Sequence, residues 1–506
     1  RVRLLALSGH VPLRLLLVQP PQGTRFGLSR ILTGEPLGLE CVGGAVRSRG
    51  YDVELVDMRL DSWEALDRAL DDPPAALGIS CAFTTDVYPT YEIARFVKER
   101  WPGLPIVIGG HHASLVPDDF LYPGSHVDAI AVGEGEMTGI GVMDALREGR
   151  PLESVPGVLT PVNRGNGFEE RPFSRDLDEL PEPDRSLSAR YRRWYHHGPN
   201  PRAAYVETSR GCPFDCNFCS VWVFYNRRAG RRSPAAICRE LERLPEETVM
   251  FTDDIAFLNY ESYKELGERI EASGMKKNFS CETRCDLVVK YRDLFAKWKK
   301  IGLNSIFLGV EKVDDEGLAE IRKRTKGGIN TNVEAIRVLR DVGIKPMTIF
   351  ITDPQWDEAD FDRLEAFIDG MELPSTAYTI MTPLPGTEMY NQRKHEIVNH
   401  DYGYYDVVHT VVPTRLPLER FYERFARLYT RTTQEIRPTW TMARQAAKMA
   451  LQGDLWVIRK TYSAAKEMRD PKAYLKGPIR VRAPRRDRPS PPLAPSAVLR
   501  GSRSRT

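Results

Sequence analysis

The sequence has 506 residues, of which 42% are hydrophobic and 28% are charged, as in an ordinary soluble globular protein. A chain of this length exceeds the size at which one core stops growing, so two or three domains are expected. No apolar run reaches the roughly eighteen residues that a membrane-spanning helix requires. Eight cysteines in so long a chain do not make a disulfide scaffold, so we expect a reducing cytoplasm.

The net charge of +3 conceals an uneven distribution. Residues 479–506 contain eight arginines and one aspartate, a net charge of +7, which leaves about −4 for the rest of the chain. The segment is rich in Pro, Ser and Arg and has few large apolar residues, so we predict a disordered basic tail. A solvated tail is one interpretation, and contact with anionic lipid or nucleic acid is the other.

Residues 13–150 alternate short apolar runs with helical patterns such as 36–49 and 86–100. The first run continues a basic, apolar beginning that we interpret as a lead-in and a first strand, not as a signal peptide. Short buried strands separated by helices predict a doubly wound, Rossmann-like parallel sheet. The predicted strands are 13–21, 52–58, 75–83, 104–112 and 127–136.

Small and polar residues gather where these strands end. Ligands of such sheets bind outside the carboxyl ends of the strands, and glycine lets the backbone approach a large ligand closely. No GxGxxG pattern follows the first strand, which argues against a dinucleotide. The candidate binding residues are Ser80, Thr84, Gly109, Gly110, His111, Gly133, Glu134 and Gly135.

Residues 151–202 are rich in Pro and charge and are predicted to be a linker. A second α/β series follows over 203–390, and its six βα units predict a partial (β/α)6 barrel because a closed barrel needs eight. Its predicted strands are 203–209, 248–254, 279–285, 305–311, 345–353 and 377–383. The carboxyl ends of these strands offer Asp253, Asp254, Glu282, Arg284 and Glu311 as candidate site residues.

Residues 391–478 are predicted to be a C-terminal helical region that contributes to substrate binding. Its helical patterns over 414–475 carry aromatic and basic residues. Aromatic residues at helical spacing usually belong to a core, and a lipid-facing surface is the alternative.

Three cysteines, Cys212, Cys216 and Cys219, follow the first strand of the second series with Cys-x3-Cys-x2-Cys spacing. Thiolates at this density bind soft metals. Zinc would need a fourth protein ligand or an open catalytic site. An iron–sulfur cluster held by three cysteines keeps one iron open, and a bidentate amino-carboxylate ligand can occupy that iron.

This motif in a six-unit half-barrel resembles the radical S-adenosylmethionine (SAM) enzymes. Residues 13–150, with "IGGHHASL" and "GEGE", resemble the cobalamin-binding domain that often precedes them. The combination is similar to the cobalamin-dependent radical SAM methylases. "CNFCSVWVFY", "FTDDIAF", "DPQWDE" and "DYGYYDVVHTVVPTRLPLERFYE" resemble the hopanoid C-3 methylases most closely.

The resemblance implies a role for each candidate residue. Cys212, Cys216 and Cys219 would ligate a 4Fe–4S cluster whose fourth iron binds SAM. Phe218 would pack on the adenine, and the remaining implied SAM contacts are Asp253 or Asp254, Glu282, Arg284 and Glu311. A helix cap is the alternative role for the aspartates, and a barrel-interior ion pair is the alternative for Glu282 with Arg284. The candidate binding residues of the first sheet would hold cobalamin.

The sequence departs from many cobalamin proteins because it lacks the Asp-x-His-x-x-Gly motif that supplies a lower ligand to cobalt. We therefore expect no histidine of that motif on the lower face. The resemblance implies methylation of an unactivated sp3 carbon, C-3 of the hopanoid A ring. The alternatives are another cobalamin-dependent radical SAM reaction, such as natural-product methylation or magnesium-protoporphyrin ester cyclisation, and a non-enzymatic cobalamin-binding regulator.

The resemblance also implies partners. The reaction would draw electrons from a low-potential donor such as a flavodoxin or ferredoxin. A hopanoid is a membrane lipid, so a cytoplasmic enzyme that contacts the inner membrane peripherally is expected. We expect no nucleic-acid partner for the enzyme.

Overall fold

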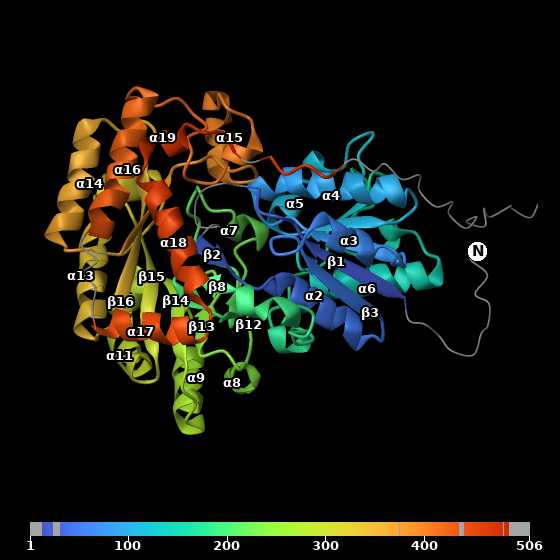
Figure 1. Cartoon of the computed structure of the whole chain (residues 1–506), viewed down its shortest axis with the longest axis horizontal. Helices are drawn as coiled ribbons and strands as arrows, with labels where there is room; N and C mark the ends of the chain where they lie inside the picture. The colour runs from blue at the N-terminus through green and yellow to red at the C-terminus, as the bar shows by residue number, and fades with distance from the viewer. Residues whose placement is uncertain (1–12, 24–30, 374, 435–439, 479, 485–506) are drawn as a thin grey trace, which may run out of the picture.

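The computed structural model describes residues 13–23, 31–373, 375–434, 440–478 and 480–484. Two α/β halves lie side by side, with the N-terminal half in blue to green and the C-terminal half in green to red (Figure 1). Each half is built on a six-stranded sheet. The sequence predicted all six strands of the second sheet but only five of the first, whose sixth strand comes from the predicted linker.

The first sheet has the strand order β3-β1-β4-β5-β6-β7. Its first five strands run parallel, and β7 joins β6 antiparallel. The chain order therefore reverses between β1 and β4, which is the crevice where doubly wound sheets bind ligands. The strands are β1 (Arg14–Gln19), β3 (Asp52–Asp57), β4 (Ala76–Ser80), β5 (Ile106–Gly109), β6 (Ala129–Ala131) and β7 (Val158–Leu159).

Helices cover both faces of this sheet, which is why its strands are apolar throughout. Helices α2 (Leu37–Ser48) and α6 (Gly135–Glu148) share a buried cluster with Leu15 and Leu17 on one face. The opposite face, which carries Leu16, packs against helices of a second cluster. These helices are α3 (Trp63–Ala69), α4 (Val87–Arg100) and α5 (His111–Leu115).

The predicted linker contributes to both halves. It supplies β7 to the first sheet, and β8 (His196–His197) and β9 (Asn200–Pro201) form a small antiparallel sheet with β2 (Leu32–Thr33). Arg185, in the same segment, pairs with Glu35 at 2.6 Å and Glu40 at 3.1 Å in the N-terminal half and with Glu240 at 2.5 Å in the C-terminal half. The segment therefore fastens the halves together.

The second sheet has the order β10-β13-β14-β15-β16-β17 with every pair parallel, which confirms the six-unit partial barrel. The strands are β10 (Ala203–Val206), β13 (Thr248–Phe251), β14 (Asn278–Arg284), β15 (Leu303–Glu311), β16 (Lys345–Thr352) and β17 (Thr376–Ile380). The helices between them are α8 (Pro234–Arg243), α9 (Tyr260–Ser273), α10 (Cys285–Lys290), α11 (Arg292–Lys300), α12 (Asp315–Glu320), α13 (Gly328–Asp341) and α14 (Glu358–Gly370).

Side chains alternate between the two faces of the barrel strands. Cys281, Ile306 and Phe350 are buried in the core shared with the surrounding helices, so their strand neighbours face the barrel interior. These inward neighbours include Glu282 and Phe307. A short antiparallel pair, β11 (Ser209–Arg210) with β12 (Gly230–Arg231), stands at the carboxyl end of β10 and encloses helix α7 (Val221–Phe224).

Five helices follow the last barrel strand in the described part of the chain. They are α15 (Glu388–Arg393) and, within the predicted C-terminal helical region, α16 (Leu418–Gln434), α17 (Trp440–Leu451), α18 (Leu455–Met468) and α19 (Pro471–Tyr474). Helix α16 packs in the barrel core, and α18 lies over the C-terminal half against the small sheet of β2, β8 and β9 (Figure 1). None of the described helices has the length and apolar character needed to cross a bilayer.

Most of the predicted basic tail, residues 485–506, lies outside the described residues. The described part packs on the N-terminal half. Ala483 is buried there and its amide donates to Glu92 at 2.8 Å.

Candidate functional site

The three cysteines of the motif lie in one loop, residues 211–220, which we call the cysteine loop. All three are free and partly exposed, whereas Cys41, Cys81, Cys238, Cys281 and Cys285 are buried. Gly211 begins the loop with φ of +85°, and a side chain there would lie 2.1 Å from the Arg228 carbonyl oxygen. Only glycine fits this position, and its amide donates to Asp254 at 2.7 Å.

Burial disfavours thiolates in the cysteine loop, and nearby cations oppose this effect. Burial raises the pKa of Cys219 to about 12 and also raises the pKa of Cys212 and Cys216. For Cys216, the nearby cations Lys323 and Arg284 oppose that increase. Metal binding requires thiolates, so bound iron and these two cations would together replace the protons. The sequence reasoning missed Lys323, which lies more than a hundred residues from the motif.

Three cysteines in one loop are too few for a structural zinc site but enough for an iron–sulfur cluster. Among the described residues, no three Cys, His, Asp or Glu side chains converge closely enough to hold one metal ion. A structural zinc ion needs four such ligands around one point. Iron–sulfur clusters instead are held by thiolates spread around several irons.

The two predicted aspartates differ in burial and in how many hydrogen bonds their carboxylates already accept. Asp253 is buried and accepts hydrogen bonds from the Thr208 amide at 2.7 Å, the Ser209 hydroxyl at 2.7 Å and the Tyr263 hydroxyl at 2.9 Å. Asp254 is partly exposed beside the cysteine loop, and burial raises its pKa to about 6. Neither caps a helix, because Asn259 caps the helix that follows. Asp254 is thus the aspartate still available to a ligand.

Glu282 and Arg284 do not pair with each other. Glu282 is exposed toward the barrel interior, yet the surrounding protein and the Glu311 carboxylate raise its pKa to about 7. Arg284 is buried, pairs with Asp286 at 3.0 Å, and stacks its guanidinium 3.7 Å from the centre of the Phe214 ring in the cysteine loop. It therefore supports the loop, and Glu282 faces open space.

Two further predicted residues lie at the same rim. Glu311 has a left-handed backbone, with φ of +66°, and pairs with Lys323 at 2.8 Å. Phe218, in the cysteine loop, packs at the edge of a small apolar cluster that includes Met381 and Met389. The carboxyl ends of β13, β14 and β15 thus carry the charged groups of this rim, and the apolar cluster at Phe218 comes from β16, the end of β17 and α15.

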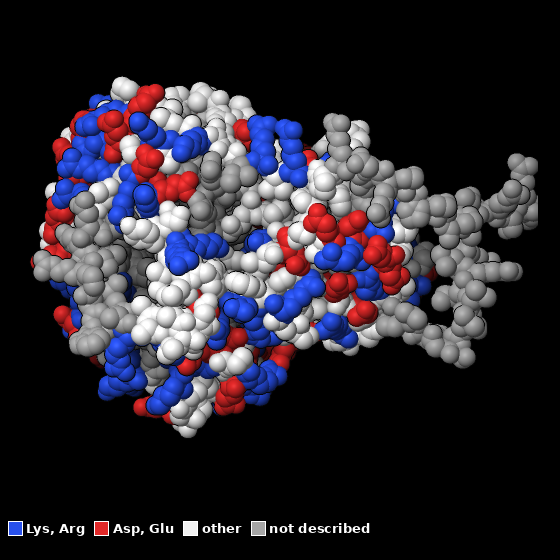
Figure 2. Space-filling model, viewed as in Figure 1, with Lys and Arg blue, Asp and Glu red and all other residues white. Residues whose placement is uncertain are grey.

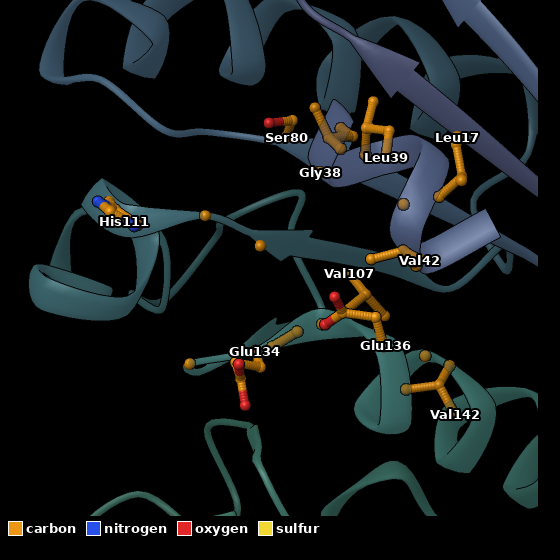
Figure 3. A pocket seen from close by; sticks show the side chains of 18 of the residues that line it. Leu17, Gly38, Leu39, Val42, Ser80, Val107, His111, Glu134, Glu136 and Val142 are labelled. Atoms are coloured by element: carbon orange, nitrogen blue, oxygen red, sulfur yellow. The ribbon is translucent and has the colours of Figure 1, made fainter. Parts of the chain in front are cut away.

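The N-terminal half contains a cavity of about 290 Å³ between its sheet and helices α2 and α6. Figure 3 shows its apolar lining, with Leu17, Leu39, Val42, Val107 and Val142 on both sides. Glycines at Gly78, Gly109 and Gly139 keep space open along its length. We call this cavity the slot.

The slot opens at the carboxyl ends of its strands, where His111 and Glu134 lie (Figure 3). Of the residues predicted to bind here, seven line the slot: Ser80, Gly109, Gly110, His111, Gly133, Glu134 and Gly135. Thr84 does not line it, because its hydroxyl bonds the buried His112 ring at 3.2 Å. Burial lowers the pKa of His111 to about 4, so its ring is neutral at neutral pH.

The C-terminal half completes the mouth of the slot. Glu207 and Arg210 line it from the end of β10 and from β11, and Phe224 and Tyr225 line it from α7. Sequence reasoning missed all four, although Arg210 stands two residues before the first cysteine and the aromatics follow the third. The slot and the cysteine loop therefore meet at one junction between the halves.

Family models match both halves of the chain. Residues 27–141 match the B12 binding domain model, and residues 206–368 match the radical SAM superfamily model. The chain is 34% identical over 463 residues to the hopanoid C-3 methylase of Methylococcus capsulatus, covering 88% of this chain and 87% of that protein. It is 26% identical to the anaerobic magnesium-protoporphyrin IX monomethyl ester cyclase of Synechocystis, covering 88% and 90%.

A solved structure shares the whole architecture. The cobalamin-dependent SAM radical enzyme OxsB, with aqua-cobalamin and SAM bound, aligns with a TM-score of 0.66 and 16% identity over 92% of this chain and 74% of that one. The enzyme therefore uses a 4Fe–4S cluster, SAM and cobalamin. The chain belongs to the cobalamin-dependent radical SAM methyltransferases, in the family that includes the hopanoid C-3 methylase.

Proposed function

We propose that this enzyme methylates C-3 of the A ring of a hopanoid. The observation that carries the proposal is the 34% identity to the hopanoid C-3 methylase, because it extends over 88% of the chain. That span exceeds the two cofactor domains together and includes sequence beyond the barrel, where substrate selection is expected.

The chemistry fits the cofactors. The target carbon is saturated and has neither a lone pair nor an acidic proton, so ordinary alkylation by SAM cannot reach it. When bound, the cluster, SAM and cobalamin supply hydrogen-atom abstraction and methyl donation, and the protein supplies orientation and exclusion of water.

We assign the cluster to Cys212, Cys216 and Cys219, with Arg284 and Lys323 as the cations that balance the negative charge of their thiolates. Asp254, Glu282 and Glu311 face the same rim and would receive the cationic groups of SAM. Asp253 is saturated by three donors at 2.7 to 2.9 Å, so its role would be to hold β10 against β13.

We assign cobalamin to the slot and its mouth. The glycines of β4, β5 and α6 admit a large ligand close to the backbone, and the apolar walls would shield it from water. His111 is stacked against Phe224, with ring centres 4.0 Å apart, so it would border the ligand as part of a packed wall.

The inward face of the barrel suits a hydrocarbon. Phe307, Met347 and Ile349 are partly exposed there, below the charged rim. The His197 ring of β8 contacts Phe307 with centres 5.3 Å apart and lies at this apolar face. A fused-ring hydrocarbon offers no hydrogen bonds, so apolar side chains are the surface that would bind it best.

The decisive experiment is expression in a bacterium that makes unmethylated hopanoids, with cobalamin supplied, followed by mass spectrometry of the lipids. We expect hopanoids one methylene heavier, with the added methyl at C-3. A Cys212→Ala variant expressed at the same level is the matched control and should give none. Absence of the product from cells whose enzyme carries cluster and cobalamin would refute the substrate assignment, and incubation with magnesium-protoporphyrin ester then tests the cyclase alternative.

We also propose that a cytoplasmic enzyme meets its lipid at the inner membrane and takes electrons from a flavodoxin or ferredoxin. The surface that supports membrane contact lies on α17 and α18, where Leu451 is 91% exposed, Tyr462 65% and Leu455 40%. Leu455, Arg459 and Tyr462 share one helical face. Figure 2 shows a largely uncharged surface over α18 with basic side chains beside it, as anionic lipid would require.

A further inference from the structure

One buried arginine joins the two halves beside the cysteines. Arg210 donates to Glu134 at 2.9 Å and Glu136 at 2.6 Å, which belong to the N-terminal half, and to Glu207 at 2.6 Å in its own half. We call this group the Arg210 fork. All four side chains line the slot, and the side chains of Arg210 and Glu136 are only 11% and 4% exposed.

The fork is rigidly connected to the cysteine loop. Arg210 is paired with Gly230 in the β11–β12 ladder, and Gly211 is fixed by its hydrogen bond to Asp254 and by its close approach to Arg228. Cys212 follows directly. A displacement of the arginine therefore moves the first cysteine with it.

The fork is equally well connected to the slot. Glu134 and Glu136 begin helix α6, which forms one wall of the slot, and the second carboxylate oxygen of Glu134 accepts from the Ser174 amide at 2.7 Å. On the other side of the loop, Phe224 stacks on His111 and Tyr225 packs on Phe173 with centres 5.1 Å apart. The cysteine loop is thus attached to the N-terminal half on both of its flanks.

We propose that Arg210 is a positioning residue that fixes the cysteine loop relative to the slot, so that methyl transfer depends on the fork while SAM cleavage does not. SAM cleavage needs only groups of the C-terminal half, whereas methyl transfer needs ligands from both halves in contact. A misplacement of about 1 Å can cost on the order of a hundredfold in rate. This inference rests on cobalamin-dependent methyl transfer and not on the identity of the substrate.

Arg210→Lys tests the proposal, because lysine keeps the positive charge but lacks the planar guanidinium that donates hydrogen bonds to three carboxylates at once. Two matched controls exist. Arg185→Lys alters another buried arginine that bridges the halves away from the cysteine loop. Arg424→Lys alters a buried arginine that contacts Glu358, Asp362 and Glu365 wholly within the C-terminal half.

The first readout is hydrogen–deuterium exchange of the full-length chain, before and after cofactor loading. We expect faster exchange in peptides covering 131–142 and 208–226 in Arg210→Lys, and unchanged exchange there in both controls. The second readout is the ratio of methylated product to 5′-deoxyadenosine. We expect 5′-deoxyadenosine formation within about threefold of wild type and a ratio roughly ten- to a hundredfold lower.

If the wild type methylates no hopanoid, S-adenosylhomocysteine formed per bound cobalamin replaces product, since that measurement needs no substrate. The proposal would be overturned if SAM cleavage and methyl transfer fell together in Arg210→Lys. It would also be overturned if Arg185→Lys lowered the ratio of methyl transfer to SAM cleavage by the same factor. Should Arg210→Lys fail to fold, Glu134→Gln removes one carboxylate and leaves the arginine with two. In that variant the ratio of methylated product to 5′-deoxyadenosine should fall several-fold. An unchanged ratio would also refute the positioning role of Arg210.

Discussion

The two halves of the enzyme differ in the shape and the charge of their candidate binding sites. The N-terminal half has a formed slot walled by aliphatic side chains and glycines, with charge only at its mouth. The rim of the barrel instead carries Asp254, Glu282, Arg284, Glu311 and Lys323 around the cysteine loop. Under the proposed assignment, cobalamin would be selected by shape, and the cluster and SAM would be selected by charge and by thiolate ligands.

The largest expected effect is the loss of cofactor binding in the C-terminal half without any loss in the N-terminal half. Cys216→Ala should abolish SAM cleavage and reduce the iron content, because the cluster would lose one of its three proposed ligands. Cobalamin binding should persist, since the slot is formed by other residues. Iron and cobalamin analysis of the reconstituted protein measures both, and Cys238→Ala, a buried thiol on α8, is the control that should retain activity. Loss of cobalamin in Cys216→Ala would show that the halves do not bind independently.

The converse change acts on the slot alone. A side chain at Gly109 would meet Ala131 at 3.7 Å, an ordinary contact, so Gly109→Leu should fold and fill the cavity. Overpacking of about 1–3 kcal/mol predicts roughly ten- to a hundredfold weaker cobalamin binding. Absorbance of bound cobalamin measures the loss, and SAM cleavage should continue. Gly103→Leu, in open space on the same half, should bind normally; equal binding by both variants would contradict the role of shape.

The outer surface of the two halves should differ in affinity for lipid. Replacing Leu455 and Tyr462 together by serine removes the exposed apolar face of α18 and should lower recovery with anionic liposomes about tenfold in flotation. Val162→Ser is the control, because Val162 is 74% exposed on the N-terminal half. Truncation to 1–478 tests the basic tail in the same assay. Equal flotation of the α18 variant and wild type would remove this surface from the proposal.

The smallest expected effect concerns charge at the barrel rim. With a pKa of about 7, Glu282 gains its negative charge as pH rises from 6 to 8. SAM is cationic, so its KM should fall over this range, by roughly two- to fivefold for an exposed charge pair. Glu282→Gln should remove this pH dependence while keeping the higher KM. Initial rates of SAM cleavage across pH measure it, and an unchanged profile in the variant would exclude Glu282 as a SAM contact.

The sequence allowed the sheets to be predicted because buried parallel strands are short apolar runs, such as 104–112 and 248–254. It did not reveal β8 and β9, whose two-residue pairing in a segment rich in Pro and charge carries no periodic signal. Phe218 and the cysteines could be proposed as site residues from local spacing. Arg210 and Lys323 were missed because their partners, such as Glu136, are brought to them by the fold and not by nearby sequence.

The shared mouth of the slot has a consequence for exchanging modules between relatives. A chimera that takes only the cobalamin-binding domain from another enzyme would keep foreign partners for Arg210, Phe224 and Tyr225, which complete that domain from across the junction. A functional transplant should therefore contain the N-terminal half together with residues 207–225. Transplants cut at the sequence boundary should load cobalamin poorly, and transplants that carry this segment should load it well.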